Sequence, residues 1–119
     1  MYGLDRSISF QFLVGKELLQ LCIGLYQLIL NFTEHVVITA ECIIRMTNTD
    51  GSVVELSSDK PELSKQLVCL LGSTVENVVF EDHGELTLVF SQGYKLTITD
   101  SNEDEESFTI TTPDQEIIV

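Results

Sequence analysis

The sequence predicts an α+β domain made mainly of antiparallel β-strands. Two pseudo-symmetric halves, each a helix followed by a β-meander, are expected to share one core. Three observations support this: the chain repeats itself, short alternating apolar runs separated by turn residues fill most of its length, and one central stretch has helical spacing. With 119 residues, 44% of them apolar, the chain is long enough for one domain with a real core over residues 1–119.

The internal repeat covers about residues 10–56 and 67–112. Val14-Gly15 is echoed by Leu71-Gly72, and the run from Leu28 to Phe32 is echoed by the run from Leu86 to Phe90. In the next strand, residues 36–41 align with residues 95–100. The spacing of matched residues thereby grows from 57 to 59 through two single-residue gaps at turns, where insertions are tolerated.

The first half is expected to begin with a short helical turn near Phe10 to Val14, ended by Gly15. Strands follow at about residues 17–23, 26–32, 36–40, 42–46 and 52–56, since apolar and polar residues alternate there between turn residues. Asp50-Gly51 between the last two runs is typical of a β-hairpin.

One clear central helix is expected from Asp59 to Leu71. Asp59 can cap it, Glu62 follows three residues later as a capping-box partner, and Pro61 falls within the first turn. Gly72 can end the helix in a left-handed conformation. The apolar stripe that defines the helix consists of Leu63, Leu67, Leu70 and Leu71.

In the second half, the alternating pattern predicts strands at about residues 74–80, 85–90, 94–99 and 107–111. Pro113 ends the last of these, and residues 115–119 can add a short edge strand.

The charge is strongly acidic. Six basic residues stand against nineteen acidic ones, for a formal net charge of -13, and Lys95 is the last basic residue. This charge argues against nucleic-acid binding and would steer a basic protein partner toward the chain, although it can also serve solubility alone. The expected contact surface is the acidic C-terminal set of Asp100, Glu103, Asp104, Glu105, Glu106, Asp114 and Glu116.

The sequence predicts a cytoplasmic chain without a membrane span. Met1 is not followed by a basic and then apolar leader, and the apolar-rich stretch of residues 10–32 is interrupted by charged and amide side chains. Cys22, Cys42 and Cys69 are too widely spaced for a zinc site or disulfide framework, which fits a reducing compartment, and their apolar surroundings indicate inert core thiols.

No metal or cofactor is expected. The stretch from Asp100 resembles a calcium loop, but Glu105 stands at the sixth position, where glycine is needed, and Thr111 at the twelfth, where glutamate is needed. No catalytic residues are predicted. An alternative function, in small-molecule binding or enzymatic chemistry, would use a cleft between the two halves where Glu41 and Asp100 converge.

An apolar outer face is predicted for the first half. In the register of the repeat, Val36 and Ile38 occupy positions where the second half has polar residues, and Ile29 stands where it has Thr87. This face needs cover, which either the central helix or a symmetric homodimer would provide.

The chain also resembles a family of small bacterial proteins of unknown function. The resemblance runs nearly end to end, from Met1-Tyr2-Gly3-Leu4 to the stretch from Asp100-Ser101 to Glu106-Ser107-Phe108. It implies no assigned activity. The leading hypothesis is a non-enzymatic binding protein, because no catalytic constellation is present, the net charge is -13 and no basic residue follows Lys95. Small acidic bacterial proteins of this type often occur beside toxin genes as immunity proteins, so the hypothesis takes the specific form of an immunity-type inhibitor of a basic toxin.

Overall fold

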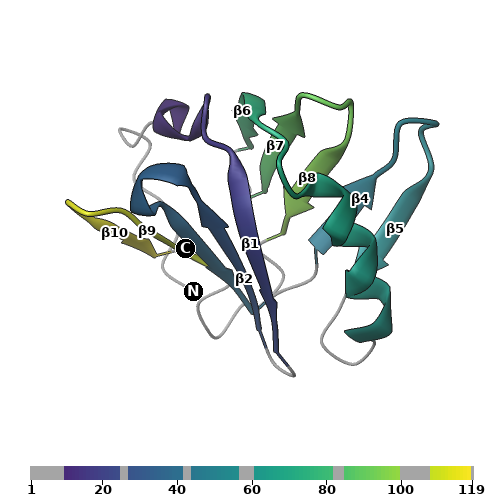
Figure 1. Cartoon of the computed structure of the whole chain (residues 1–119), viewed down its shortest axis with the longest axis horizontal. Helices are drawn as coiled ribbons and strands as arrows, with labels where there is room; N and C mark the ends of the chain where they lie inside the picture. The colour runs from purple at the N-terminus through teal and green to yellow at the C-terminus, as the bar shows by residue number, and fades with distance from the viewer. Residues whose placement is uncertain are drawn as a thin grey trace.

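Two five-stranded antiparallel sheets make up most of the computed structural model (Figure 1). The structure describes residues 10–24, 27–41, 44–56, 61–81, 85–99 and 108–118, without the side chains of residues 61–65 and 118. The first sheet has the order β1-β2-β3-β9-β10 and the second the order β5-β4-β8-β7-β6. The strands are β1 Leu18–Ile23, β2 Leu28–Phe32, β3 Val37–Ala40, β4 Ile44–Thr47, β5 Val53–Leu56, β6 Val75–Phe80, β7 Leu86–Phe90, β8 Lys95–Ile98, β9 Phe108–Thr111 and β10 Glu116–Ile118.

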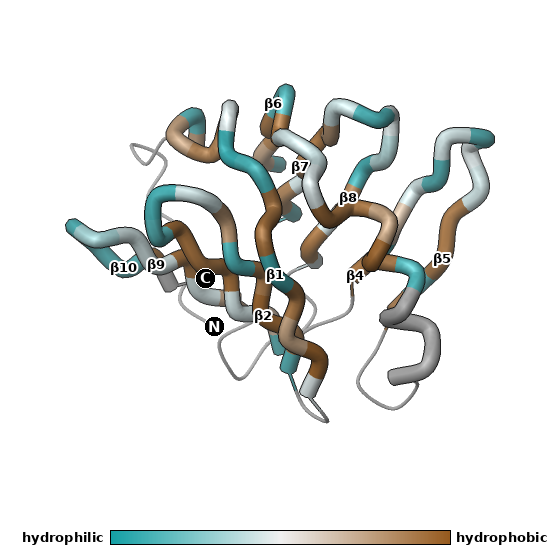
Figure 2. The backbone as a smooth tube through the Cα atoms, in the orientation of Figure 1, coloured by the Kyte–Doolittle hydropathy of each residue, from teal (hydrophilic) through white to brown (hydrophobic). Residues whose placement is uncertain are grey.

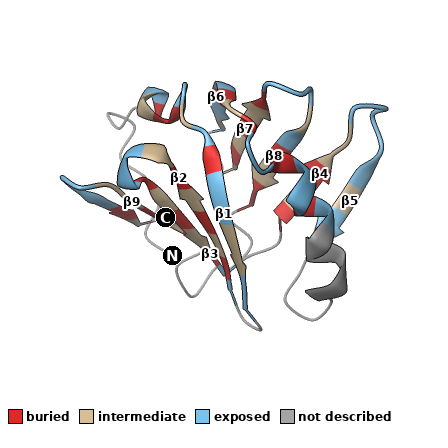
Figure 3. Ribbon diagram, viewed as in Figure 1, coloured by how far each residue is buried: buried red, intermediate tan, exposed pale blue. Residues whose placement is uncertain are grey.

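Each strand that the alternating pattern predicts is present, so the expectation of a mainly antiparallel β protein is confirmed. In β2, Leu28, Leu30 and Phe32 are buried, whereas Ile29 and Asn31 are half-buried. The same alternation recurs in β7, and Figure 3 shows it as red and tan in turn along β2 and β7. A period of two residues places every second side chain in the core.

The two halves exchange their last hairpins. The β4–β5 hairpin joins the sheet of the second half through β8, and the β9–β10 hairpin joins the sheet of the first half through β3. The expected β-meander of each half therefore holds for its first three strands and is wrong for its last hairpin. The chain crosses between the sheets after β3 and after β8, and strand periodicity does not determine which sheet edge a hairpin pairs with.

Matching backbone hydrogen bonds join the halves where the two sheets meet. Gly15 donates to the carbonyl of Val75 at 2.8 Å, and Gly72, 57 positions after Gly15, donates to the carbonyl of Leu18 at 2.9 Å. Both glycines have the positive φ, +91° and +84°, that side-chain-bearing residues rarely adopt. An isolated bridge between Glu17 and Thr74 completes the junction.

The helical segments among the described residues are the 3₁₀ helices η1 Gln11–Leu13 and η3 Pro61–Leu70, and the short turn η2 Thr33–His35, in which Glu34 has non-helical backbone angles. The clear central helix is thus wrong in type, and its Asp59 cap lies outside the described residues. Among the side chains described in η3, Leu67 and Leu70, three positions apart, are buried, while Leu71 just after it is 39% exposed and the side chain of Leu63 lies outside the description. Three residues per turn bring positions i and i+3 to one face, so the buried pair suits a 3₁₀ helix.

One hydrophobic core lies between the sheets and takes side chains from both. The largest fully buried ones include Phe90 and Met46 from the second sheet and Phe108 from the first. Leu13 of η1 and Leu70 of η3 are also fully buried, and η1 contacts β6 whereas η3 contacts β1 and β5. In Figure 2 apolar segments, drawn in brown, recur along the strands of both sheets. The short helices therefore fill the open sides of the two-sheet core.

The predicted apolar outer face of the first half is wrong for Val36 and Ile38. They are 3% and 0% exposed and point into the core. The positions of β3 and β8 match with a spacing of 58, not 59, so Ile38 corresponds to buried Leu96 rather than to a polar residue. A register error of one residue moves every side chain of a strand to the other face. Ile29 alone of the three lies outward, half-buried.

Backbone strain marks the β2–β3 turn, where Glu34 and His35 have φ of +62° and +61°. The matching turn of the second half has Gly93 in the place of His35. We expect His35→Gly to stabilise the protein by about 0.5–1 kcal/mol, because glycine adopts this conformation without strain but loses more entropy on folding. Equilibrium urea unfolding measures the change. The matched control, Gly93→Ala, should destabilise by about 1 kcal/mol, and equal effects of the two would contradict the assignment.

Candidate functional site

The acidic C-terminal hairpin is the strongest candidate surface. Its turn is closed by Thr112, whose amide donates to the carbonyl of Gln115 at 2.8 Å and whose Oγ1 accepts from the amide of Asp114 at 3.3 Å. Asp114 at the turn and Glu116 at the start of β10 are both exposed. The turn therefore presents two carboxylates to solvent from a hydrogen-bonded backbone.

The other five residues of the predicted acidic surface, Asp100, Glu103, Asp104, Glu105 and Glu106, lie outside the described residues. The chain reaches this segment from Thr99 after β8 and leaves it at Phe108, the first residue of β9. β9 spans about 10 Å from Phe108 to Thr111 at roughly 3.3 Å per residue. Within the described residues, the structure thus places Asp114 and Glu116 one short strand away from the point where the acidic segment ends.

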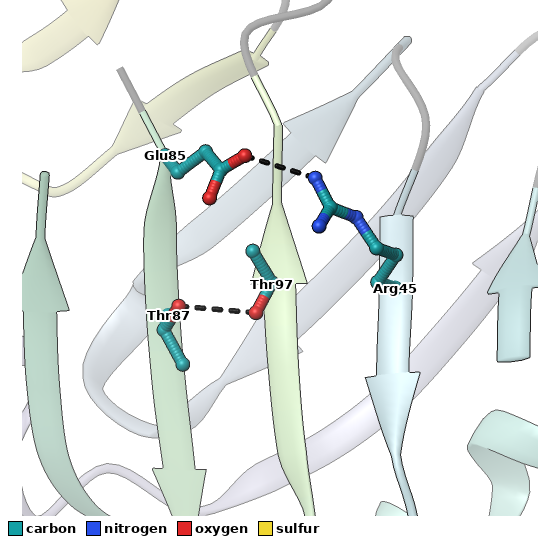
Figure 4. Close-up of polar contacts among 4 residues, drawn as sticks. All are labelled: Arg45, Glu85, Thr87 and Thr97. Carbon is teal, nitrogen blue, oxygen red and sulfur yellow. Dashed lines mark hydrogen bonds and ion pairs between the residues drawn. The ribbon is translucent and has the colours of Figure 1, made fainter. Parts of the chain in front are cut away.

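The described cations lie elsewhere. Lys16 Nζ is 3.3 Å from Glu34 Oε1 at the β2–β3 turn. On the outer face of the second sheet, Arg45 of β4 donates to Glu85 Oε2 at 2.9 Å, beside the Thr87–Thr97 hydroxyl pair at 3.0 Å (Figure 4). Among the described side chains, no cation forms an ion pair with the carboxylates of the β9–β10 hairpin, so the negative charge of the hairpin is not neutralised there.

Two side chains near the β4–β5 turn have shifted acidities. Hydrogen bonds from the side chain and then the backbone amide of Ser52 lower the pKa of Asp50, whose Oδ1 accepts them at 2.7 and 2.9 Å. The neighbouring Cys69 thiol raises the pKa of Tyr94. Both shifts favour the form that each group already has at neutral pH, charged for Asp50 and neutral for Tyr94. Neither group is thereby prepared for acid–base catalysis.

The predicted pairing of Glu41 with Asp100 is not resolved, because Asp100 lies outside the described residues. Glu41 is exposed after β3, and at the spacing of 58 its counterpart is the buried Thr99, not Asp100. The alternative function with a cleft between the halves stays a prediction, and Glu41 is its one described carboxylate.

The cysteines differ from the expectation of core thiols. Cys69 is exposed and donates to the carbonyl of Gln66 at 3.0 Å, and Cys22 is half-buried on the first sheet. Cys42 lies outside the described residues. Where the chain is described, no cluster of three or more His, Cys, Asp or Glu side chains is placed to hold a metal ion. None of the described helices has the length and apolar character needed to cross a membrane.

Comparison with known proteins identifies an uncharacterised family. A model described as a family of unknown function (DUF6188) matches residues 11–119 of the chain. No curated protein and no solved structure matches it. The expected membership of a family without an assigned activity is confirmed.

Proposed function

The chain belongs to the family of unknown function DUF6188, and we propose that it is a non-enzymatic protein that binds a basic protein partner. In its specific form the proposal is an immunity-type inhibitor that captures a basic toxin in the bacterial cytoplasm. One observation carries it: the exposed carboxylates of Asp114 and Glu116 stand on a fixed hairpin at the end of a chain with no basic residue after Lys95.

Electrostatic steering explains why this arrangement would serve binding. A net charge of -13 attracts a basic protein from a distance, and unpaired surface carboxylates set its orientation on contact. The field of exposed charges extends over about 8 Å at physiological salt, which is comparable to the length of β9. The carboxylates of Asp114 and Glu116, which lie next to β9, can therefore act on one partner surface.

A pair of charge-reversed variants tests the proposal. In Asp114→Lys/Glu116→Lys the hairpin loses its negative charge, while Glu76→Lys/Glu81→Lys makes the same change in net charge at exposed positions in and just after β6 of the second sheet. Each protein is immobilised and exposed to extracts of the native host at low salt, and retained basic proteins are identified and titrated. We expect the hairpin variant to bind the retained partner at least about tenfold more weakly than the control variant does.

Salt provides the second measurement. At about 1 M salt, where the screening length falls to about 3 Å, the wild-type complex should dissociate. The proposal would be contradicted if no basic protein is retained at low salt. It would also be contradicted if the affinity for the retained partner changes neither with salt nor in the hairpin variant. Neutralisation of the partner's activity by the wild type would distinguish an inhibitor from a passive binding protein.

A further inference from the structure

Among the described residues, the outer edge of β10 differs from the other three sheet edges. At the edges of the first sheet, β1 lies beside η3 (Figure 1), and in the second sheet η3 contacts β5 and η1 contacts β6. β10, from Glu116 to Ile118, pairs with β9 as its one strand neighbour in the described part of the chain. An open strand edge is a template for another strand.

The direction of the β10 backbone groups follows from the turn. The amide of Thr112 donates to the carbonyl of Gln115, and the pair Ile117–Ile110 lies two register positions further along, after the pair Glu116–Thr111. Hydrogen-bonded and non-bonded pairs alternate along an antiparallel ladder, and so Ile117 exchanges its hydrogen bonds with β9. The amides and carbonyls of Glu116 and Ile118 therefore point to the open edge.

The side chains of β10 define what an added strand would carry. Ile117 is 4% exposed and continues an inner row of buried aliphatic side chains that includes Ile110 and Ile38. Glu116 is on the opposite, outer face and is exposed. A strand paired with β10 would extend the aliphatic row with one side chain and place the next beside the Glu116 carboxylate.

We propose that the partner binds by adding an extended segment to β10, in which Lys or Arg alternates with a β-branched aliphatic residue. The proposal rests on the proposed function, since it gives the binding mode of the same basic partner. Backbone hydrogen bonds to Glu116 and Ile118 supply affinity, and the alternation supplies specificity. A second copy of the chain fits less well, because it would bring two edges of the same negative charge together.

Two synthetic peptides of equal length and charge test this binding mode. A Lys-Val repeat can add as a strand, whereas the fixed φ of proline at every second position holds a Lys-Pro repeat in a polyproline II conformation, which does not form a β-ladder. Amide hydrogen exchange of the full chain is followed by NMR with each peptide. We expect the Lys-Val peptide to slow exchange at Glu116 and Ile118 at least tenfold and the Lys-Pro peptide to leave both unchanged.

A matched pair of variants separates charge from backbone addition. Glu116→Gln removes the carboxylate alone, and Glu116→Pro removes the same charge together with the outward N–H, at an edge position where proline is tolerated. We expect Glu116→Pro to bind the Lys-Val peptide at least fivefold more weakly than Glu116→Gln does. An NMR spectrum of each variant that closely matches the spectrum of the wild type confirms that the variant is folded.

The outcomes distinguish this inference from the proposed function. Equal binding of both peptides without protection at Glu116 and Ile118 would refute strand addition and leave charge-driven capture in place. Slow exchange at these amides in the peptide-free chain would also refute it: dependence on protein concentration would identify a second copy at the edge, and independence would identify another segment of the same chain. Failure to retain any basic host protein would refute the proposed function itself.

Discussion

Ile38→Lys is expected to unfold the protein. Ile38 is fully buried in β3, between Leu30 of β2 and Ile110 of β9. A lysine there would bury an unpaired charge and remove an aliphatic side chain from the core, a cost of at least about 4 kcal/mol. Because the free energy of unfolding of small domains is about 5–15 kcal/mol, a loss of this size removes much or all of it. Circular dichroism during urea titration measures it.

Two control substitutions make this result specific. Ile38→Val retains an apolar side chain and should cost about 1 kcal/mol. Ile29→Lys changes a half-buried residue on the outer face of the same sheet and should cost no more than about 1 kcal/mol. A folded Ile38→Lys protein with near-normal stability would show that Ile38 lies outward, as the alignment of the two halves of the sequence predicted. The homodimer remains a prediction, and Ile29 is the one outward residue of its predicted surface.

Leu70→Ala is expected to destabilise the protein by about 2–5 kcal/mol. Leu70 is the last residue of η3 and is fully buried, together with Leu67 one 3₁₀ turn earlier. A ten-residue 3₁₀ helix has little stability of its own, so its place in the structure depends on these two side chains. Truncation leaves a cavity between the edges of the two sheets, and urea unfolding at equilibrium reports the loss.

The same segment supplies the control. Val68 is 52% exposed in η3, so Val68→Ala should change stability by no more than about 0.5 kcal/mol. Leu13→Ala in η1, 57 positions before Leu70, should cost about as much as Leu70→Ala because Leu13 is equally buried. A large effect of Val68→Ala with a small effect of Leu70→Ala would show that η3 presents its other face to the core.

The candidate site was only partly accessible from the sequence. Composition alone identified the acidic C-terminal region and the absence of basic residues after Lys95. It could not show that β10 ends the first sheet, because this depends on β9 pairing with β3 across the molecule. The apolar run Ile117-Ile118-Val119 after a turn did predict a short edge strand at residues 115–119, but not the sheet to which this strand belongs.

The sequence by itself determined the strands and the turns between them. Alternation of apolar and polar residues fixes which side chains of a strand share a face, and glycines such as Gly15 and Gly72 mark backbone conformations that other residues avoid. Both signals are local, which is why each expected strand is present.

Only the tertiary structure decided the partners of those strands. Every strand edge offers the same backbone donors and acceptors, so nothing local made β4 pair with β8 or β9 with β3. The inward direction of Ile38 was also decided by packing, since a shift of one residue in the register of β3 would turn this side chain outward. The 3₁₀ form of η3 has the same cause, because the surfaces on which Leu67 and Leu70 pack determine how deeply these two side chains are buried. Close packing of a shared core selects among arrangements that the local pattern leaves equal.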